Sequence, residues 1–155
     1  MTASAERRTA ARPEKESRRK AREVAVQMLY QWEVARDPMD DVVRTFWTHG
    51  PAAAELMAED LRAFAITLAR GVASSVAEID PLITEAAEHW RIERMNVLDR
   101  LILRLAIYEF LHEPDTPSRV VINEALELAR TFSTDDSVRF INGVLDAVRR
   151  TLKRE

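Results

Sequence analysis

Apolar residues recur at intervals of three and four along almost the whole chain, and no segment alternates convincingly between apolar and polar residues. This spacing places apolar side chains on one face of a helix, whereas a half-buried strand would need a period of two. The sequence therefore predicts an all-α fold. Prolines and polar cap residues interrupt the pattern often enough to predict seven or so helices with short connections, which favours packed antiparallel bundles.

The expected helices differ in how much of their surface is apolar. The segment at 97–112 is apolar on nearly every side, so we expect it to be the central, most buried helix. We expect Trp90 to belong to the buried stripe of the helix before it, and the interruptions at Gly50-Pro51 and Asp80-Pro81 to end helices. The predicted helices cover about 17–36, 41–48, 61–79, 82–90, 97–112, 117–132 and 134–152.

Two glycines, Gly71 and Gly143, stand inside these helical stripes. A glycine within a helix costs about 1 kcal/mol relative to alanine, so each position needs a compensating reason. The simplest reason is that a neighbouring helix approaches closely, and we expect this at both positions.

The composition excludes several kinds of site. The 155 residues suit one ordinary domain, the absence of cysteine excludes disulfides and thiolate sites, and three glycines are too few for a glycine-rich phosphate loop. One Glu-x-x-His pair, Glu109 and His112, has the spacing of a di-iron ligand pair but lacks the second copy that such a site needs. With no nucleophile elbow either, the sequence predicts neither an enzyme nor a metal site.

Charge is distributed unevenly along the chain. Residues 1–22 hold eight Lys or Arg against three Glu, a net charge of +5, so the rest of the chain carries −8 of the total of −3. A basic arm suits a polyanion such as nucleic acid, and an acidic body suits a basic protein. The first twenty residues contain no apolar run and no segment is long enough to span a bilayer, so we expect a cytoplasmic protein without membrane contact.

The basic residues are densest at 18–22. At 100° per residue, Arg18, Arg19 and Arg22 fall within an arc of about 100° on one flank of the apolar stripe, which would form an edge able to contact phosphates. A solvated, charged helix start is the alternative interpretation. It is weakened because cations at a helix N-terminus oppose the helix dipole.

A second hint lies in the last predicted helix. Phe140 falls at the edge of its apolar stripe, beside Arg139. A half-exposed aromatic ring next to an arginine can stack on an unpaired base, which is worth about 1–3 kcal/mol per base. A peripheral core residue that packs on a neighbouring helix would show the same pattern, so both interpretations stand.

Four blocks of the sequence, in order, resemble the NusB family of transcription antitermination factors. They extend over most of the chain, from about Arg18 to Asp146. The blocks are RKAREVAVQMLYQW at 19–32, DRLILRLAIYE at 99–109, VINEALELAR at 121–130, and FSTDDS followed by FINGVLD within 132–146.

The resemblance implies an all-helical fold of two three-helix bundles that share a long core, with neither enzymatic activity nor a cofactor. It implies binding of the boxA element of nascent ribosomal RNA together with NusE, a small-subunit ribosomal protein. This complex would join RNA polymerase and other Nus factors to suppress premature termination. The implied RNA-binding residues are Arg18, Arg19, Lys20, Arg22, Asp136, Ser137, Arg139 and Phe140, and the implied NusE-binding residues are Tyr30 and Asp99.

We expect one NusB-like domain over 17–155, with an N-terminal bundle at about 17–79 and a C-terminal bundle at about 80–155. Residues 1–16 form a longer leader than the family pattern, and we expect a flexible basic extension there. Two other functions remain open. One is a stand-alone helical adaptor that binds proteins without RNA, and the other is the RNA-recruiting module of an RNA methyltransferase.

Overall fold

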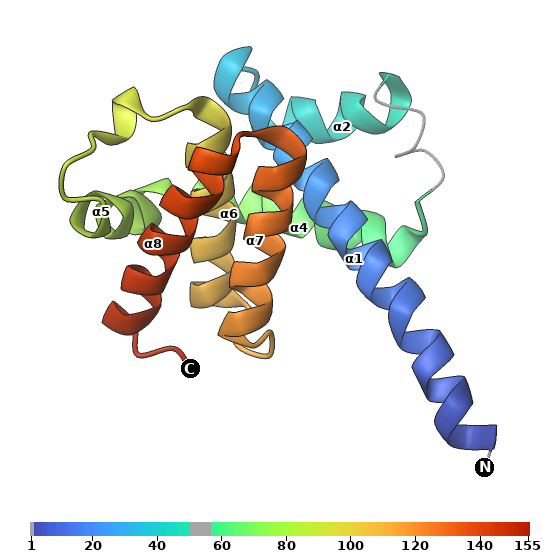
Figure 1. Cartoon of the computed structure of the whole chain (residues 1–155). Coiled ribbons are helices and arrows are strands. Elements are labelled where there is room, and N and C mark those ends of the chain that lie inside the picture. Colours follow the sequence, from blue (N-terminus) through green and yellow to red (C-terminus); the bar gives the residue numbers. More distant parts are fainter. Residues whose placement is uncertain (1, 50–56) are drawn as a thin grey trace.

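The computed structural model describes residues 2–49 and 57–155, and every regular element within these ranges is helical (Figure 1). The predicted all-α fold is confirmed. None of these helices combines the length and apolar character needed to cross a bilayer. The helices are α1 (Thr2–Val34), α2 (Met39–His49), α4 (Glu59–Ser74), α5 (Val76–Ala86), the 3₁₀ turn η1 (Ile92–Arg94), α6 (Val97–His112), α7 (Ser118–Phe132) and α8 (Asp135–Thr151).

Helix α6 is the centre of the molecule, as its apolar surface predicts. Residues 101–110 are all buried, and α6 packs against α1, α4, α5, α7 and α8. Because neighbours cover it on every side, even its charged residues Arg104 and Glu109 are buried. Their charges must therefore be neutralised by partners from other helices, since an unpaired buried charge is very costly.

Helix α1 is longer than predicted. The sequence analysis placed the start of the helix at Ser17, whereas α1 begins at Thr2 and its first half extends away from the other helices (Figure 1). Alanine, arginine, glutamate and lysine dominate the leader, and these residues favour a helix without help from packing. The helix start predicted at about residue 17 is therefore wrong.

The third predicted helix is two helices in the structure. The break falls at Ser75, not at Asp80-Pro81, and Pro81 lies inside α5. The sequence pattern continues across the break because both helices are amphipathic, but α4 packs mainly on α1 while α5 packs on α6 and α8. Consequently the expected bundle boundary at residues 79 and 80 falls within α5. The predicted stop at Gly50-Pro51 lies outside the described residues.

The two mid-helix glycines have different surroundings. A methyl group at Gly71 would overlap the ring of Tyr108, so α4 and α6 approach closely there, as predicted. At Gly143 a methyl group would meet no atom within 4 Å, and the residue is exposed. The prediction of close helix approach is thus wrong at Gly143, since helical periodicity cannot show whether a neighbour covers that turn.

Candidate nucleic-acid interface

The three arginines predicted to form a phosphate-binding edge, and Lys20, which the family resemblance adds, lie on α1 but differ in availability. Arg22 is only 3% exposed, and its guanidinium donates to the Glu109 carboxylate, with Nη2 2.8 Å from Oε1 and Nε 3.0 Å from Oε2. Glu109 is equally buried on α6. A phosphate could reach Arg22 only by displacing this carboxylate, so the geometry assigns Arg22 to the structure of the molecule and not to its surface.

Arg19 is held in a similar way at the edge of the core. Its Nε and Nη2 donate to the two oxygens of Glu124 on α7, at 2.9 and 3.1 Å, and about a third of its side chain stays exposed. The hydrogen bond to Glu124 raises the pKa of Arg19 further above its ordinary value. The guanidinium is therefore permanently charged, and it faces both a carboxylate and solvent.

The other two cations of this set are exposed. Arg18 and Lys20 are exposed, and neither forms an ion pair with a side chain that the structure describes, in residues 17–48 and 57–155. The Arg18 guanidinium lies 5.3 Å from the centre of the Phe64 ring, which fixes the direction of the side chain without neutralising its charge. We call Arg18, Arg19, Lys20 and Arg22 the leading-helix group; its exposed charge is concentrated at Arg18 and Lys20.

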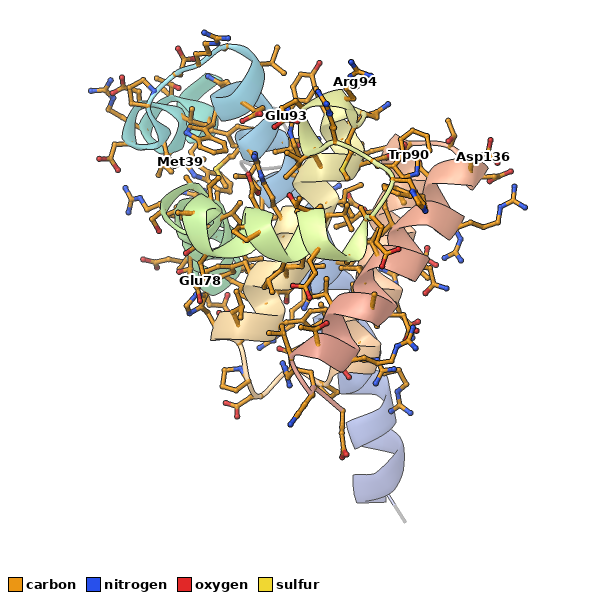
Figure 2. The ribbon with its side chains drawn as sticks, turned by 90° about the vertical axis from the view of Figure 1, so that its left-hand side faces the viewer. Met39, Glu78, Trp90, Glu93, Arg94 and Asp136 are labelled. Carbon is orange, nitrogen blue, oxygen red and sulfur yellow. The ribbon has the colours of Figure 1, made fainter. Side chains whose placement is uncertain are left out.

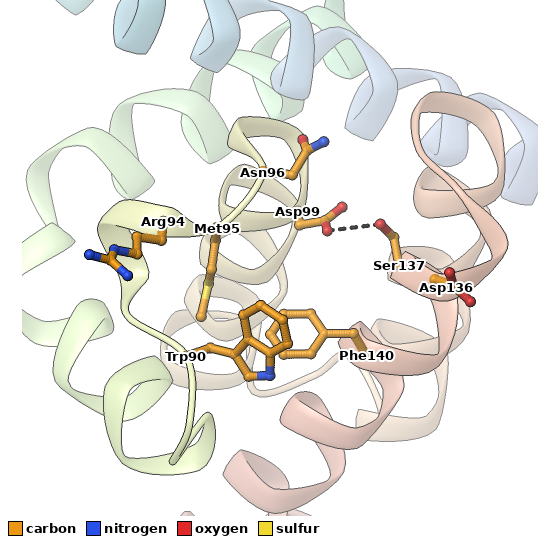
Figure 3. Close-up of a pocket in the computed structure, with 8 residues that line it drawn as sticks. All are labelled: Trp90, Arg94, Met95, Asn96, Asp99, Asp136, Ser137 and Phe140. Carbon is orange, nitrogen blue, oxygen red and sulfur yellow. Dashed lines mark hydrogen bonds between the residues drawn. The ribbon is translucent and has the colours of Figure 1, made fainter.

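The second set of predicted residues lies at the start of α8. The Thr134 hydroxyl accepts a hydrogen bond from the Ser137 backbone N–H at 3.2 Å and so caps the start of α8. Ser137 itself is buried, and its hydroxyl donates to the Asp99 carboxylate at 2.8 Å (Figure 3). By contrast, Asp136 and Arg139 form an ion pair of 2.7 Å in which both side chains are almost fully exposed.

Phe140 is half-buried and meets a residue that the sequence analysis assigned to the core. Its ring centre lies 5.9 Å from that of Trp90 in an edge-to-face arrangement (Figure 3). Trp90 is not part of a buried helical stripe: α5 ends at Ala86, and Trp90 is 59% exposed. The sequence does contain a signal for this exposure, because charged or titratable residues surround Trp90 from Glu88 to Arg94.

A recess of about 350 Å³ opens between these residues. It is bordered by the segment before α6 and by the starts of α6 and α8. We call Trp90, Phe140, Asp136, Ser137 and Arg139 the aromatic group. The recess is lined by Trp90, Arg94, Met95, Asn96, Asp99, Asp136, Ser137 and Phe140.

The two groups do not converge into one cluster. The leading-helix group lies where α1 passes α7, because Arg19 contacts Glu124. The aromatic group lies at the start of α8, on the side of that helix that faces the segment between α5 and α6 and not α1 (Figures 1 and 2). An extended ligand could contact both, whereas a small molecule could not.

Comparison with known proteins identifies the family. The family model described as the NusB family matches residues 19–150. The chain belongs to the NusB family. The transcription antitermination protein NusB of Koribacter versatilis is 50% identical over 139 residues, which cover 90% of this chain and 92% of that protein. The NusB protein of Solibacter usitatus is 46% identical over 140 residues, covering 88% and 90%.

Solved structures agree with this NusB fold. NusB of T. maritima superposes with a TM-score of 0.76 at 33% identity, covering 86% of this chain and 90% of that one. A structure of antitermination factors NusB and NusE in complex with dsRNA matches with a TM-score of 0.76 at 22% identity, covering 88% and 98%. The second similarity supports the fold alone.

NusB proteins are antitermination factors and not enzymes, in agreement with the sequence analysis. The two residues of the Glu-x-x-His pair contact side chains on other helices and not a shared metal site. Glu109 accepts hydrogen bonds from Arg22, and Nε2 of His112 lies 3.1 Å from Oε2 of Glu78. Within the described residues, no group of three or more His, Asp or Glu side chains could hold a metal ion.

The two residues that the NusB resemblance implies for NusE binding differ in exposure. Tyr30 on α1 is 44% exposed and available to a partner. Asp99 is buried, and its carboxylate accepts hydrogen bonds from the hydroxyls of Ser133 and Ser137, each at 2.8 Å. The structure therefore gives Asp99 an internal role, joining the start of α6 to the start of α8.

Proposed function

We propose that this NusB-family chain binds single-stranded boxA-type RNA together with NusE, and that it acts in the cytoplasm in an antitermination complex with RNA polymerase and other Nus factors. The observation that carries the RNA part is the pair of exposed cations, Arg18 and Lys20, on the helix that the family resemblance assigns to RNA. Exposed, unneutralised cations release counterions when they bind phosphates, and this release dominates affinity for nucleic acids.

The other predicted residues differ in exposure, and this supports a different role for each. Arg19 can share its guanidinium between Glu124 and a phosphate, because a third of the side chain is exposed. Arg22 contributes indirectly: its buried pair with Glu109 fixes α1 against α6 and so sets where Arg18 and Lys20 point. Tyr30 is exposed further along α1 and suits contact with the ribosomal protein.

Filter binding with boxA RNA and with a scrambled strand, each with and without NusE, tests the proposal. The double variant Arg18→Ala/Lys20→Ala should bind boxA RNA more weakly and flatten the slope of log K against log salt by roughly 1.4, about 0.7 for each lost phosphate contact. The matched control is Arg44→Ala/Arg70→Ala, which removes the same charge from exposed positions on α2 and α4.

Two outcomes would contradict this function. Equal affinities and slopes for both double variants would mean that the leading-helix group does not contact RNA. If the wild-type chain binds NusE but no RNA under any condition, the chain is instead a protein-interaction adaptor, the alternative that its acidic body allows.

A further inference from the structure

Trp90 leaves most of its large apolar side chain exposed at the surface. It is the most exposed large hydrophobic side chain among the described residues, although it contacts Phe140 on one side. Burying a large apolar side chain stabilises a protein by about 1.5–3 kcal/mol, and here most of that gain is forgone. The Trp90 ring borders the recess, so a flat ligand could stack on its exposed face.

The segment that carries Trp90 is held in place and is not a loose loop. Ala87 and Met95 are buried at its two ends, and the Trp90 backbone N–H donates to the Ala87 carbonyl at 2.9 Å. In the middle, Arg100 of α6 donates to the Ile92 carbonyl at 3.1 Å. Because the ring is already positioned, a ligand that stacks on it does not have to order the segment first.

The recess beside Trp90 combines aromatic walls with polar groups at its rim. Its volume of about 350 Å³ lies within the range of small-ligand sites. The Asn96 side-chain oxygen accepts from the Leu98 N–H at 2.9 Å, which leaves its amide N–H groups as donors. The Asp136 carboxylate, exposed beside the recess, supplies an acceptor. A flat ring with both donors and acceptors on its edge matches these groups.

Two exposed arginines next to Trp90 offer contacts to phosphates, beside the acidic residues Glu93, Asp99 and Asp136. Arg91 and Arg94 are exposed and form no ion pair within the described part of the chain, although most other arginines there do. Trp90 lies between Arg94 and Asp136 when the molecule is viewed from that side (Figure 2). The Arg94 guanidinium points away from the recess, where it could meet a phosphate next to a bound base (Figure 3).

We propose that the recess binds one unpaired nucleobase of the RNA, stacked on the exposed face of Trp90, and that Arg91 and Arg94 hold the adjoining phosphates. The inference rests on the proposed function and deepens it. It adds the segment 87–96 to the RNA-binding surface and makes Phe140 a support for the Trp90 ring. Stacking tolerates any base, because every base has a flat face, whereas the arginines add the salt dependence.

Three variants of the full chain test this, with boxA RNA as the probe. Trp90→Ala should weaken binding roughly 5- to 150-fold without changing the salt slope, since stacking releases no counterions. Trp90→Phe should retain most of the affinity. Arg94→Ala should flatten the slope by about 0.7. The matched control is Val34→Ala, which truncates another exposed apolar residue.

Fluorescence gives a second, independent measurement. The chain has three tryptophans, so the signal of Trp90 is obtained as the wild-type signal minus that of Trp90→Phe. RNA should quench this difference signal and protect it from acrylamide. Because Trp90 is exposed, unfolding midpoints of all variants should stay close to wild type, and this separates binding from folding.

The outcomes are distinct. If the wild type binds RNA but Trp90→Ala binds equally well and the difference signal is unchanged, the nucleobase site is refuted and the proposed function stands. If Trp90→Ala loses affinity for NusE and not for RNA, the recess is a protein contact and the inference is also refuted. If the wild type binds no RNA, both proposals fail.

Discussion

The leading-helix group and the aromatic group look alike in sequence, since each contains arginine at the start of a helical stripe, but the structure treats them differently. In the leading-helix group, Arg19 and Arg22 bind carboxylates that are almost completely buried, on helices α7 and α6. In the aromatic group, Arg139 pairs with Asp136 at the surface, and both charges remain in water. The comparison teaches that a buried carboxylate makes an arginine unavailable to a ligand where the arginine is itself buried, as at Arg22, and only partly available where it reaches the surface, as at Arg19.

The largest effect should come from breaking the buried pair. Arg22→Ala leaves the Glu109 carboxylate buried and uncompensated, so the free energy of unfolding should fall by about 3–5 kcal/mol. Urea denaturation measures this. Arg18→Ala, four residues away and exposed, should change stability by no more than about 0.5 kcal/mol. Similar losses for the two variants would remove the distinction between the buried and the exposed cations of the leading-helix group.

The next effect concerns the tight contact between α4 and α6. Gly71→Ala should destabilise the chain by about 1–3 kcal/mol, because the added methyl group overlaps the Tyr108 ring and forces it to move. Thermal unfolding followed by circular dichroism is the measurement. An unchanged midpoint would show that the Tyr108 ring shifts without cost.

Ser137 is the buried member of the aromatic group, and removing its hydroxyl should lower the free energy of unfolding by less. Ser137→Ala removes the hydroxyl that donates to Asp99, and we expect a loss of about 1–2 kcal/mol, since Ser133 still donates to the same carboxylate. Asp136→Ala, which removes an exposed neighbour, is the control and should be nearly neutral. A neutral Ser137→Ala would mean that the link between α6 and α8 does not stabilise the fold.

The smallest effect should have the opposite sign. Gly143→Ala on α8 meets open space, so the gain in helix propensity should raise stability by about 0.5–1 kcal/mol. Chemical denaturation again measures the change. A loss of stability would mean that something approaches Gly143 after all, and the aromatic side of the molecule would then be less open than described.

The sequence was informative wherever the signal was local. The apolar surface of 97–112 predicted the central helix, and the pattern at 134–152 predicted the start of α8 within one residue. The family resemblance named the candidate residues on α1 and α8 but not Trp90. Local signals failed at Ser75, because one continuous stripe served two helices that pack on different partners, and at Trp90, because the apolar spacing continued past the end of α5 at Ala86.

What the sequence by itself determined was the helical class, the central helix, the family and the uneven charge along the chain, because periodicity, composition and motifs are properties of neighbouring residues. Only the tertiary structure decided which cations are free. Arg19 and Arg22 meet carboxylates 105 and 87 residues away in the chain, and Trp90 meets Phe140 from another helix. Neutralisation and exposure depend on such distant contacts, which no local pattern of residues records.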